Sequence, residues 1–346
     1  MRRLRSSSSE LKRELVRVPD EWPLIGHIAF GLIDRGTNLI QVRPVTTCPL
    51  CCVFCSVDAG PCSRRRQVEY VVELDHIVEW FAEVAKFKGS RDIQAHIDTV
   101  GDPLTYPELV DLVQALSEVE GVSVISLETH GPLLTERVVD ELEAAGLTRI
   151  NLSIDSLDPN LAKELAGVSW FDVTRVAELA EYIARCTSLD LIITPVWVPG
   201  LNDREIPRII EFATRIGAGK RCPPLGIQKY EAHKHGRKPR GVKPMSWGAF
   251  YAKLREWERA YGVKLVLRPE DFGIRRAKEL PLAMRRGEVV RAKVVGPGWL
   301  RGQALAVARG RVVTVVGVRD HEPLVGQWVK VRVLRVKHNI YVARMA

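Results

Sequence analysis

Two spacings of apolar residues organise most of the chain. Between residues 39 and 261, short apolar runs alternate with longer stretches in which apolar side chains recur every three or four residues. Short runs are typical of buried strands, and the longer period is typical of amphipathic helices. The expected strands are 39–42, 93–100, 122–127, 149–154, 189–193 and 225–229, and the expected helices are 75–87, 106–116, 135–145, a helical stretch ending at 183, 203–216 and 246–261.

This alternation predicts an α/β fold. Strands that alternate with helices pair in parallel through right-handed crossovers. Six such units predict a partial (β/α)6 TIM-like barrel over residues 39–270, with Thr135 as a helix N-cap and Gly146 as a helix stop. We interpret residues 1–38 as an N-terminal extension and residues 271–284 as a linker. In barrels of this kind, the loops that follow the strands carry the chemistry.

The pattern changes in the last part of the chain, residues 285–346. Short β-branched runs at 289–295, 304–307, 312–316, 328–336 and 340–343 alternate there with glycine turns. Five short strands in this length predict a small antiparallel β-barrel of the oligonucleotide-binding type. The outward positions change phase between Arg332 and Arg335, which predicts a β-bulge.

Positive charge is concentrated in the same region. The chain has a net charge of +9, and residues 285–346 hold thirteen Lys and Arg against three acidic residues, so the rest of the chain is close to neutral. Cations placed near phosphates release counterions, and such an imbalance is typical of a module that binds a polyanion. The alternative is a basic tail without a ligand.

Composition excludes several classes of protein. The chain is 46% hydrophobic, which excludes disorder throughout. Its longest apolar stretch, 191–201, is short and contains prolines, and the N-terminus, with Arg2, Arg3 and Arg5, lacks the apolar segment of a signal peptide. We therefore expect a cytoplasmic protein that does not enter a membrane.

Cysteines supply the first chemical signal. Four of the seven lie between Cys48 and Cys55, directly after the first predicted strand, a clustering that favours metal binding in a reducing compartment. All four could bind zinc, although structural zinc pairs usually come from separated knuckles. Cys48, Cys52 and Cys55 alone could instead ligate three irons of a cubane cluster and leave the fourth iron open.

The spacing Cys48-x-x-x-Cys52-x-x-Cys55, with an aromatic residue before the last cysteine, resembles the signature of the radical S-adenosylmethionine (radical SAM) superfamily. The resemblance implies a [4Fe-4S] cluster on these cysteines, and it excludes Cys51 as a fourth ligand because that would block the cofactor. It also implies reductive cleavage of SAM to a 5′-deoxyadenosyl radical, with an external electron donor.

Further segments between about 39 and 267 match the same family. Val100-Gly101-Asp102-Pro103 resembles a Gly-Gly-Glu-Pro segment that holds the methionine amino group, with two substitutions. Segments at the ends of the later strands resemble the parts that contact the ribose, carboxylate and adenine. The SAM-binding residues that the resemblance implies are Phe54, Gly101, Asp102, Thr129, Ser153, Asp155, Pro199 and Asn202.

Two other features near the expected pocket have open interpretations. Cys62 lies beside Arg64, Arg65 and Arg66, and nearby cations lower the pKa of a thiol, so Cys62 is a candidate catalytic thiol. The alternative interpretation is that Cys62 is an incidental cysteine without a catalytic role. The polar residues around the sixth strand are interpreted as a satisfied surface loop, namely Gln228, Tyr230, Glu231, His233 and His235.

Residues 285–346 resemble a TRAM domain, an oligonucleotide-binding-fold-like β-barrel at the C-terminus of several RNA-modifying enzymes. A second basic stretch, residues 215–243, lies near the sixth strand. The resemblance implies that a tRNA or rRNA is held mainly by its phosphates and that the target base is offered to the radical. The expected RNA contacts are Arg291, Lys293, Arg309, Arg311, Lys330, Arg332, Arg335 and Lys337.

Together these features predict a radical SAM enzyme that modifies a base in tRNA or rRNA. Two alternatives stay open at this point. One is a radical SAM enzyme that acts on a peptide or small metabolite, and the other is a non-catalytic RNA-binding protein with a structural metal site. The sequence leaves open the reaction subclass and the oligomeric state.

Overall fold

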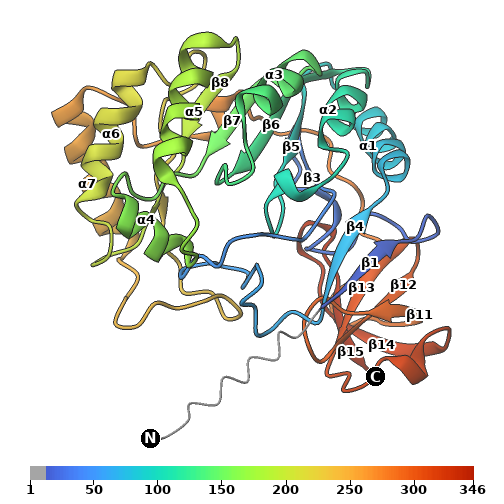
Figure 1. Ribbon diagram of the computed structural model, residues 1–346. Coiled ribbons are helices and arrows are strands. Elements are labelled where there is room, and N and C mark those ends of the chain that lie inside the picture. Colours follow the sequence, from blue (N-terminus) through green and yellow to red (C-terminus); the bar gives the residue numbers. More distant parts are fainter. Residues whose placement is uncertain (1–12) are drawn as a thin grey trace, which may run out of the picture.

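A computed structural model describes residues 13–346 of the chain (Figure 1). The expectation about Arg2, Arg3 and Arg5 and the absent signal peptide rests largely on residues that lie outside this range. None of the helices within residues 13–346 has both the length and the apolar character needed to cross a membrane.

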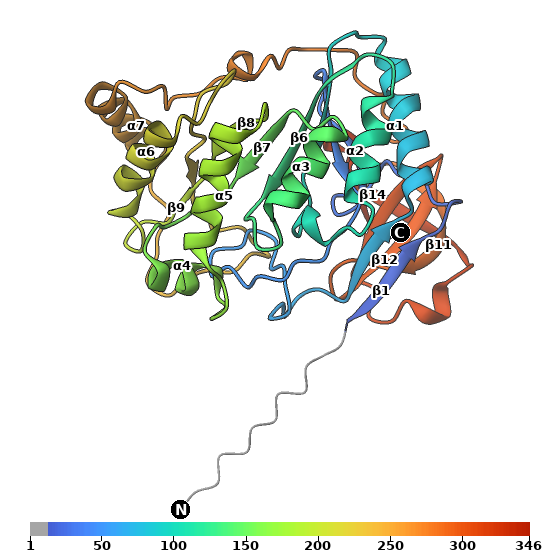
Figure 2. The same cartoon turned by 45° about the horizontal axis from the view of Figure 1, so that its top comes forward.

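A six-stranded sheet forms the core, in the order β2-β3-β5-β6-β7-β8. All neighbours pair in parallel except β2 and β3, which are antiparallel. Figure 2 shows α1, α2, α3 and α5 along one side of this sheet. The strands are β2 (Gly31–Asp34), β3 (Leu39–Arg43), β5 (Ile93–Ile97), β6 (Val122–Thr129), β7 (Arg149–Leu152) and β8 (Asp190–Ile193).

The helices follow the predicted order. Their bounds are α1 (Leu74–Lys88), α2 (Leu109–Ser117), α3 (Glu136–Ala144), α4 (Pro159–Ala166), α5 (Val173–Cys186), α6 (Glu205–Ile216) and α7 (Trp247–Tyr261). The predicted cap of α3 is confirmed, because the Thr135 side chain accepts a hydrogen bond from the backbone N–H of Val138. The core α/β architecture predicted from the sequence is therefore confirmed.

Two parts of the core differ from the sequence prediction. The helical stretch up to 183 is two helices, α4 and α5, because the chain leaves α4 at Gly167 with a φ of 67°. A Cβ atom at Gly167 would lie 2.2 Å from the carbonyl oxygen of Cys51, so only glycine fits there. The sequence also gave no signal for β2, nor for the parallel pair β1 (Glu14–Val18) and β4 (Val68–Val72).

The sixth predicted strand, 225–229, forms a single bridge to the sheet and a two-residue strand. Leu225 makes a parallel bridge to Ile193 at the end of β8. The short strands β9 (Val196–Trp197) and β10 (Gln228–Lys229) then pair in parallel as a separate two-stranded sheet. The sheet is therefore a partial barrel whose last strand is short.

The C-terminal region is a closed five-stranded barrel with the order β11-β12-β13-β15-β14. All neighbours are antiparallel except β13 and β15. The predicted bulge is confirmed, because the register of β14 against β15 shifts between Val333 and Arg335. The strands are β11 (Val289–Pro297), β12 (Gln303–Ala308), β13 (Arg311–Val316), β14 (Trp328–Arg335) and β15 (Val342–Met345).

This barrel packs directly against the core, beside β1 and β4 in both ribbon views (Figures 1 and 2). The hydroxyl of Tyr70 in β4 donates to the carbonyl oxygen of Pro297 at 2.7 Å. Gly26 has a φ of 132°, and a Cβ atom there would lie 2.1 Å from the carbonyl oxygen of Val312. Close backbone contact and a buried tyrosine therefore fix the barrel to the core.

Candidate active site and basic barrel face

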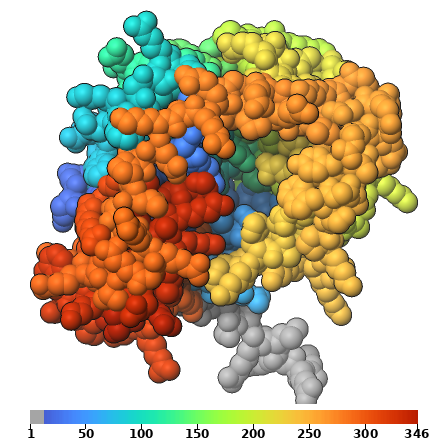
Figure 3. All heavy atoms as spheres, turned by 180° about the vertical axis from the view of Figure 1, so that it is seen from behind, coloured from blue at the N-terminus to red at the C-terminus, as the bar shows by residue number. Residues whose placement is uncertain are grey.

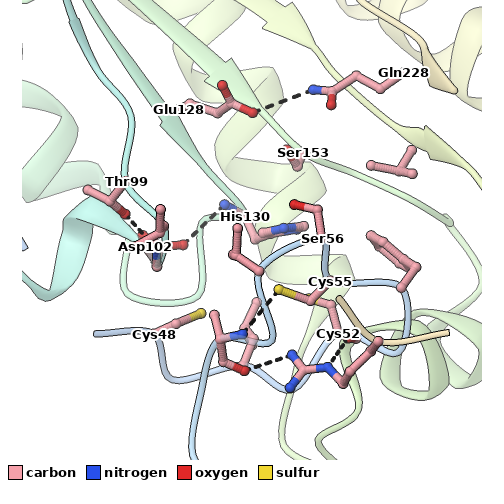
Figure 4. A pocket seen from close by; sticks show the side chains of 18 of the residues that line it. Cys48, Cys52, Cys55, Ser56, Thr99, Asp102, Glu128, His130, Ser153 and Gln228 are labelled. Carbon is pink, nitrogen blue, oxygen red and sulfur yellow. Dashed lines mark hydrogen bonds between the residues drawn. The ribbon is translucent and has the colours of Figure 1, made fainter. Parts of the chain in front are cut away.

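A pocket of about 380 Å³ opens at the carboxyl ends of the core strands. It is lined by the loops after β3 and β5, by the ends of β6 and β7, and by the segment from β10 onward. Figure 4 shows three thiols at one end and an acid–amide pair at the other. From end to end, the labelled side chains are Cys48, Cys52 and Cys55, then Asp102, His130 and Ser153, and finally Glu128 and Gln228.

The three predicted ligand cysteines lie together in this pocket, and none of them is in a disulfide. Phe54, predicted beside them, is buried and also lines the pocket. Burial raises the pKa of the Cys48 thiol to about 12 and that of Cys52 well above its usual range. Metal binding to these thiols would therefore release protons.

Helix α4 and a glycine shape the cysteine loop. The backbone N–H of Cys51 donates to the carbonyl oxygen of Ala166, and that of Val53 donates to Leu165. Gly60 has a φ of 89°, and a Cβ atom there would lie 1.7 Å from the carbonyl oxygen of Leu50. The loop therefore turns back on itself so closely that only glycine is accommodated.

Arg237, which follows β10, holds the same loop as well. Its Nε donates to the carbonyl oxygen of Cys52 at 2.7 Å and its Nη2 to that of Ala59 at 2.7 Å. Its Nη1 lies 3.1 Å from the Asp58 carboxylate. The sequence placed Arg237 in a basic loop but gave no sign of this role, since its partners lie far away in the chain.

Arg66 is a second arginine that sequence reasoning missed as a structural residue. Its side chain is fully buried, donates to the carbonyl oxygens of Thr46 and Val100, and pairs with Glu69 at 2.9 Å. Thr46 precedes the cysteine loop, and Val100 lines the pocket. Arg66 therefore ties two walls of the pocket together.

Asp102 organises the turn after β6. Its carboxylate accepts hydrogen bonds from the Thr129 hydroxyl at 2.9 Å and from the backbone N–H of His130 at 3.2 Å. Burial raises the pKa of Asp102. Gly101 beside it lies against the preceding loop, where a Cβ atom would be 2.0 Å from the carbonyl oxygen of Thr47. These predicted residues are thus brought together at the pocket wall.

The remaining predicted cofactor residues divide into two groups. Ser153 lines the pocket and shares a hydrogen bond with Thr194 at 3.2 Å. Asp155 does not line the pocket, but its carboxylate lies 3.6 Å from Nδ1 of His130, accepts from the N–H of Val196 at 2.8 Å, and has its pKa raised by burial. Asn202 is fully buried with backbone partners and Pro199 is half-buried, and neither lines the pocket.

Polar residues line the end of the pocket that lies away from the cysteines. Gln228 donates to the Glu128 carboxylate at 3.4 Å, and His96 Nε2 lies 3.5 Å from the same carboxylate. Lys229 pairs with Glu231 at 2.5 Å. Of the loop residues treated as surface from the sequence, Gln228, Tyr230, Glu231 and His233 line the pocket, and His235 does not.

Cys62 lies outside the pocket. It is exposed, and it forms a disulfide with Cys51, the cysteine within the metal motif that does not face the pocket. The Arg237 Nη1 also contacts the Cys62 sulfur at 3.0 Å. Sequence reasoning did not foresee this disulfide, because the spacing of the cysteines resembled a metal motif.

The basic residues of the C-terminal barrel gather mainly on one face. In the antiparallel register of β11 and β14, Arg291 is opposite Lys330 and Lys293 is opposite Trp328. All four side chains are exposed, as is Arg332, and the Arg291 guanidinium lies 5.4 Å from the Trp328 ring centre. Trp328 is 58% exposed and is not among the RNA contacts expected from the sequence.

The other predicted RNA contacts lie elsewhere on the barrel. Arg309 donates to the Glu288 carboxylate at 2.6 Å, and Arg311 is half-buried at the start of β13. Arg335 and Lys337 are exposed at and beyond the end of β14. Within the barrel strands themselves, no residue is acidic.

Comparison with known proteins decides the family. The model of the radical SAM superfamily matches residues 42–213. The uncharacterized protein MJ0103 of Methanocaldococcus jannaschii is 40% identical over 96% of this chain and 81% of its own length. The chain belongs to the radical SAM superfamily. Radical SAM proteins use a [4Fe-4S] cluster and SAM, and they need an electron donor.

Two further comparisons cover part of the chain. The GTP 3′,8-cyclase of Alkaliphilus oremlandii is 29% identical over 52% of this chain and 54% of its own length, so the chain spans about half the length of that relative. The crystal structure of Streptococcus suis SuiB superposes with a TM-score of 0.50 at 20% identity, covering 68% of this chain and 47% of SuiB. SuiB therefore supports the fold of the core.

The pocket fits the cofactors of a radical SAM protein. Three thiols outside any disulfide line one end, which matches the donor set of a cluster with one open iron. Cys51, which would otherwise compete as a fourth ligand, is bound to Cys62. Polar groups and free space lie beside the thiols, where SAM would be received (Figure 4).

Proposed function

We propose that this radical SAM enzyme modifies a base in tRNA or rRNA in the cytoplasm. In this proposal Cys48, Cys52 and Cys55 hold the cluster, and an external donor supplies the electron. Residues 285–346 form a TRAM-like module that holds the RNA. When bound, the cluster and SAM would supply radical chemistry at the pocket.

The observation that carries the RNA proposal is the composition of the β11–β14 face. Its exposed side chains include arginines and lysines around Trp328, together with the apolar Val289 and Leu334, and the barrel strands contain no acid that would repel phosphate. Phosphate contacts supply affinity, while an exposed aromatic ring offers a stacking surface for an unpaired base. An exposed tryptophan among the cations favours a binding module over a basic tail without a ligand.

The pocket side chains have distinct tasks in this proposal. Arg237 and Arg66 hold the cluster loop and the wall at Val100 in place. Asp102 fixes the turn that bears His130, which faces the pocket. Glu128 and Gln228, at the end away from the thiols, are placed to hydrogen-bond the target base.

The proposal is tested by mass spectrometry of nucleosides from tRNA and rRNA of the source organism, with and without this gene. We expect one modified nucleoside to disappear on deletion. The wild-type gene should restore it, and a Cys52→Ala gene should not. Unchanged nucleosides in both RNA pools would overturn the proposal.

A second candidate is a reaction on a free purine nucleotide. The similarity to GTP 3′,8-cyclases over about half the chain favours it, because those relatives are named for acting on GTP. Incubating the reconstituted protein with SAM, a reductant and GTP distinguishes the two candidates. Formation of 5′-deoxyadenosine that depends on GTP, together with unchanged RNA, would favour the nucleotide.

A further inference from the structure

We propose that Trp247 and Tyr251, at the start of α7, form a stacking site for an unpaired RNA base next to the target nucleotide. This inference rests on the proposed RNA substrate and goes beyond it. It adds a contact surface on the core, and it specifies that the RNA is single-stranded where it enters the pocket.

The two rings form an exposed aromatic pair on one side of α7. They are four residues apart, their ring centres are 5.7 Å apart, and their planes are inclined by 24°. Trp247 is 53% exposed and Tyr251 is 37% exposed. Arg255, four residues further along the helix, is exposed as well. Large aromatic side chains that stay open to water beside a cation are typical of a binding surface.

Lys229 connects this pair to the pocket. Lys229 lines the pocket, and its Nζ lies 4.7 Å from the ring centre of Trp247. A single side chain, that of Lys229, therefore lies between the pocket and the exposed rings. A nucleotide whose base occupied the pocket would place its neighbour within reach of Trp247 and Tyr251.

The segment that leads into α7 has the charge that RNA requires. Between Ala232 and Ser246 it contains five Lys and Arg residues and no Asp or Glu. His233 and Arg237 from this segment also line the pocket. Phosphates that follow the segment would meet only positive or neutral side chains.

The molecular surface places this segment and the barrel around one opening. Figure 3 shows a hollow bordered by the C-terminal residues in red, the segment before the barrel in orange and the segment after β10 in yellow. An RNA strand held on the barrel could therefore reach the Trp247–Tyr251 pair across this hollow. Stacking on aromatic side chains needs bases released from a duplex, which points to a loop or an unpaired end.

The test measures binding of the full-length protein to two fluorescein-labelled RNAs, an unpaired twelve-nucleotide strand and a twelve-base-pair duplex. Trp247→Ala and Tyr251→Ala should each weaken binding of the unpaired strand by about 5- to 150-fold, as expected for loss of one base stack. Trp247→Phe should keep most of the affinity. The salt dependence should not change, because no charge is removed.

Trp170→Ala is the matched control. Trp170 is also 53% exposed but lies between α4 and α5, where it lines a small pocket with Asp172 and Arg175. Its removal should leave both RNA affinities unchanged, and melting temperatures of all variants should confirm folding.

The outcomes separate this inference from the proposed function. If the wild-type protein binds neither RNA, the RNA substrate itself is wrong and the inference fails with it. If the wild type binds the unpaired strand and both alanine variants bind it equally well, only the stacking site is wrong. Equal weakening for the strand and the duplex would also overturn it, since paired bases cannot stack on these rings.

Discussion

The guanidinium of Arg66 lies 4.8 Å from the ring centre of Trp299 and joins the pocket wall to the C-terminal barrel. Arg66 belongs to the core and Trp299 to the barrel, and their backbones also meet, through the bridge between Arg66 and Leu300. The same guanidinium donates to carbonyl oxygens at the pocket. The barrel therefore supports the residue that holds the pocket walls.

Trp299→Ala should destabilise the protein by about 3–5 kcal/mol. The substitution removes a buried ring and leaves a cavity beside the Arg66 guanidinium. Urea unfolding at neutral pH measures this loss. Trp328→Ala on the same barrel is the control and should cost less than about 1 kcal/mol, since its ring is exposed. Equal losses for the two variants would contradict a supporting role for Trp299.

Arg237→Ala should make the cluster labile. The variant loses hydrogen bonds to the carbonyl oxygens of Cys52 and Ala59 and the ion pair with Asp58, each bond being worth about 0.5–3 kcal/mol. After anaerobic reconstitution, we expect iron to pass to a ferrous chelator at least about tenfold faster than from the wild type. Arg237→Lys should rescue little, because an ammonium group cannot replace a planar fork with several separated partners.

Arg240→Ala is the matched control for that measurement. Arg240 is an exposed arginine in the same segment, and within residues 13–346 its side chain makes no hydrogen bond. It should release iron at the wild-type rate. An equal rate for Arg237→Ala would show that the loop does not depend on the arginine.

His27 should make the protein sensitive to mild acid. It packs against Phe30 and Tyr70, and burial, helped by the charge of Arg43, lowers its pKa from 6.5 to about 3. Between these values the unfolded chain binds a proton that the folded protein does not, so stability falls as the pH falls below 6.5. From pH 7 to pH 5, this one group should cost about 2 kcal/mol.

The measurement is urea unfolding of the wild type and His27→Phe at both pH values. The variant should lose less stability on acidification, by about the same 2 kcal/mol. Parallel losses in the two proteins would show that His27 already has an ordinary pKa in the fold.

The Cys51–Cys62 disulfide should stabilise the protein under oxidising conditions. It closes a loop with a sequence separation of 11 residues, for which chain entropy gives a stabilisation of about 2–3 kcal/mol. Cys62→Ser should lose that amount in unfolding experiments without reductant and match the wild type when a dithiol is present. Cys186→Ser, at an exposed free cysteine, is the control and should show no dependence on reductant.

Local patterns in the sequence predicted much of the fold and the site. The cysteine loop, the Thr135 cap and the bulge in β14 each depend on residues close together in the chain, and most strands and helices were signalled by their own period. The small barrel was similarly visible because its short runs and glycines lie within sixty-two residues.

Long-range partners explain what the sequence could not show. Arg237 and Cys52 are 185 residues apart, and Tyr70 meets Pro297 across 227 residues. The strand β2 precedes the strand–helix alternation and pairs antiparallel with β3, so the pattern that predicted the other core strands did not extend to it. The motif predicted that Asp102 lies at the site. Only the fold shows that its carboxylate accepts hydrogen bonds from the Thr129 hydroxyl and the His130 N–H.

The hold of Arg237 on the cysteine loop also sets an order of events during protein synthesis. Cys52 leaves the ribosome 185 residues before Arg237 does, a delay of roughly 10–40 s at common rates of elongation. During that interval, the loop lacks the hydrogen bonds that Arg237 donates to the carbonyl oxygens of Cys52 and Ala59. The nascent chain thus has a period in which iron and sulfide can be delivered before Arg237 binds the loop.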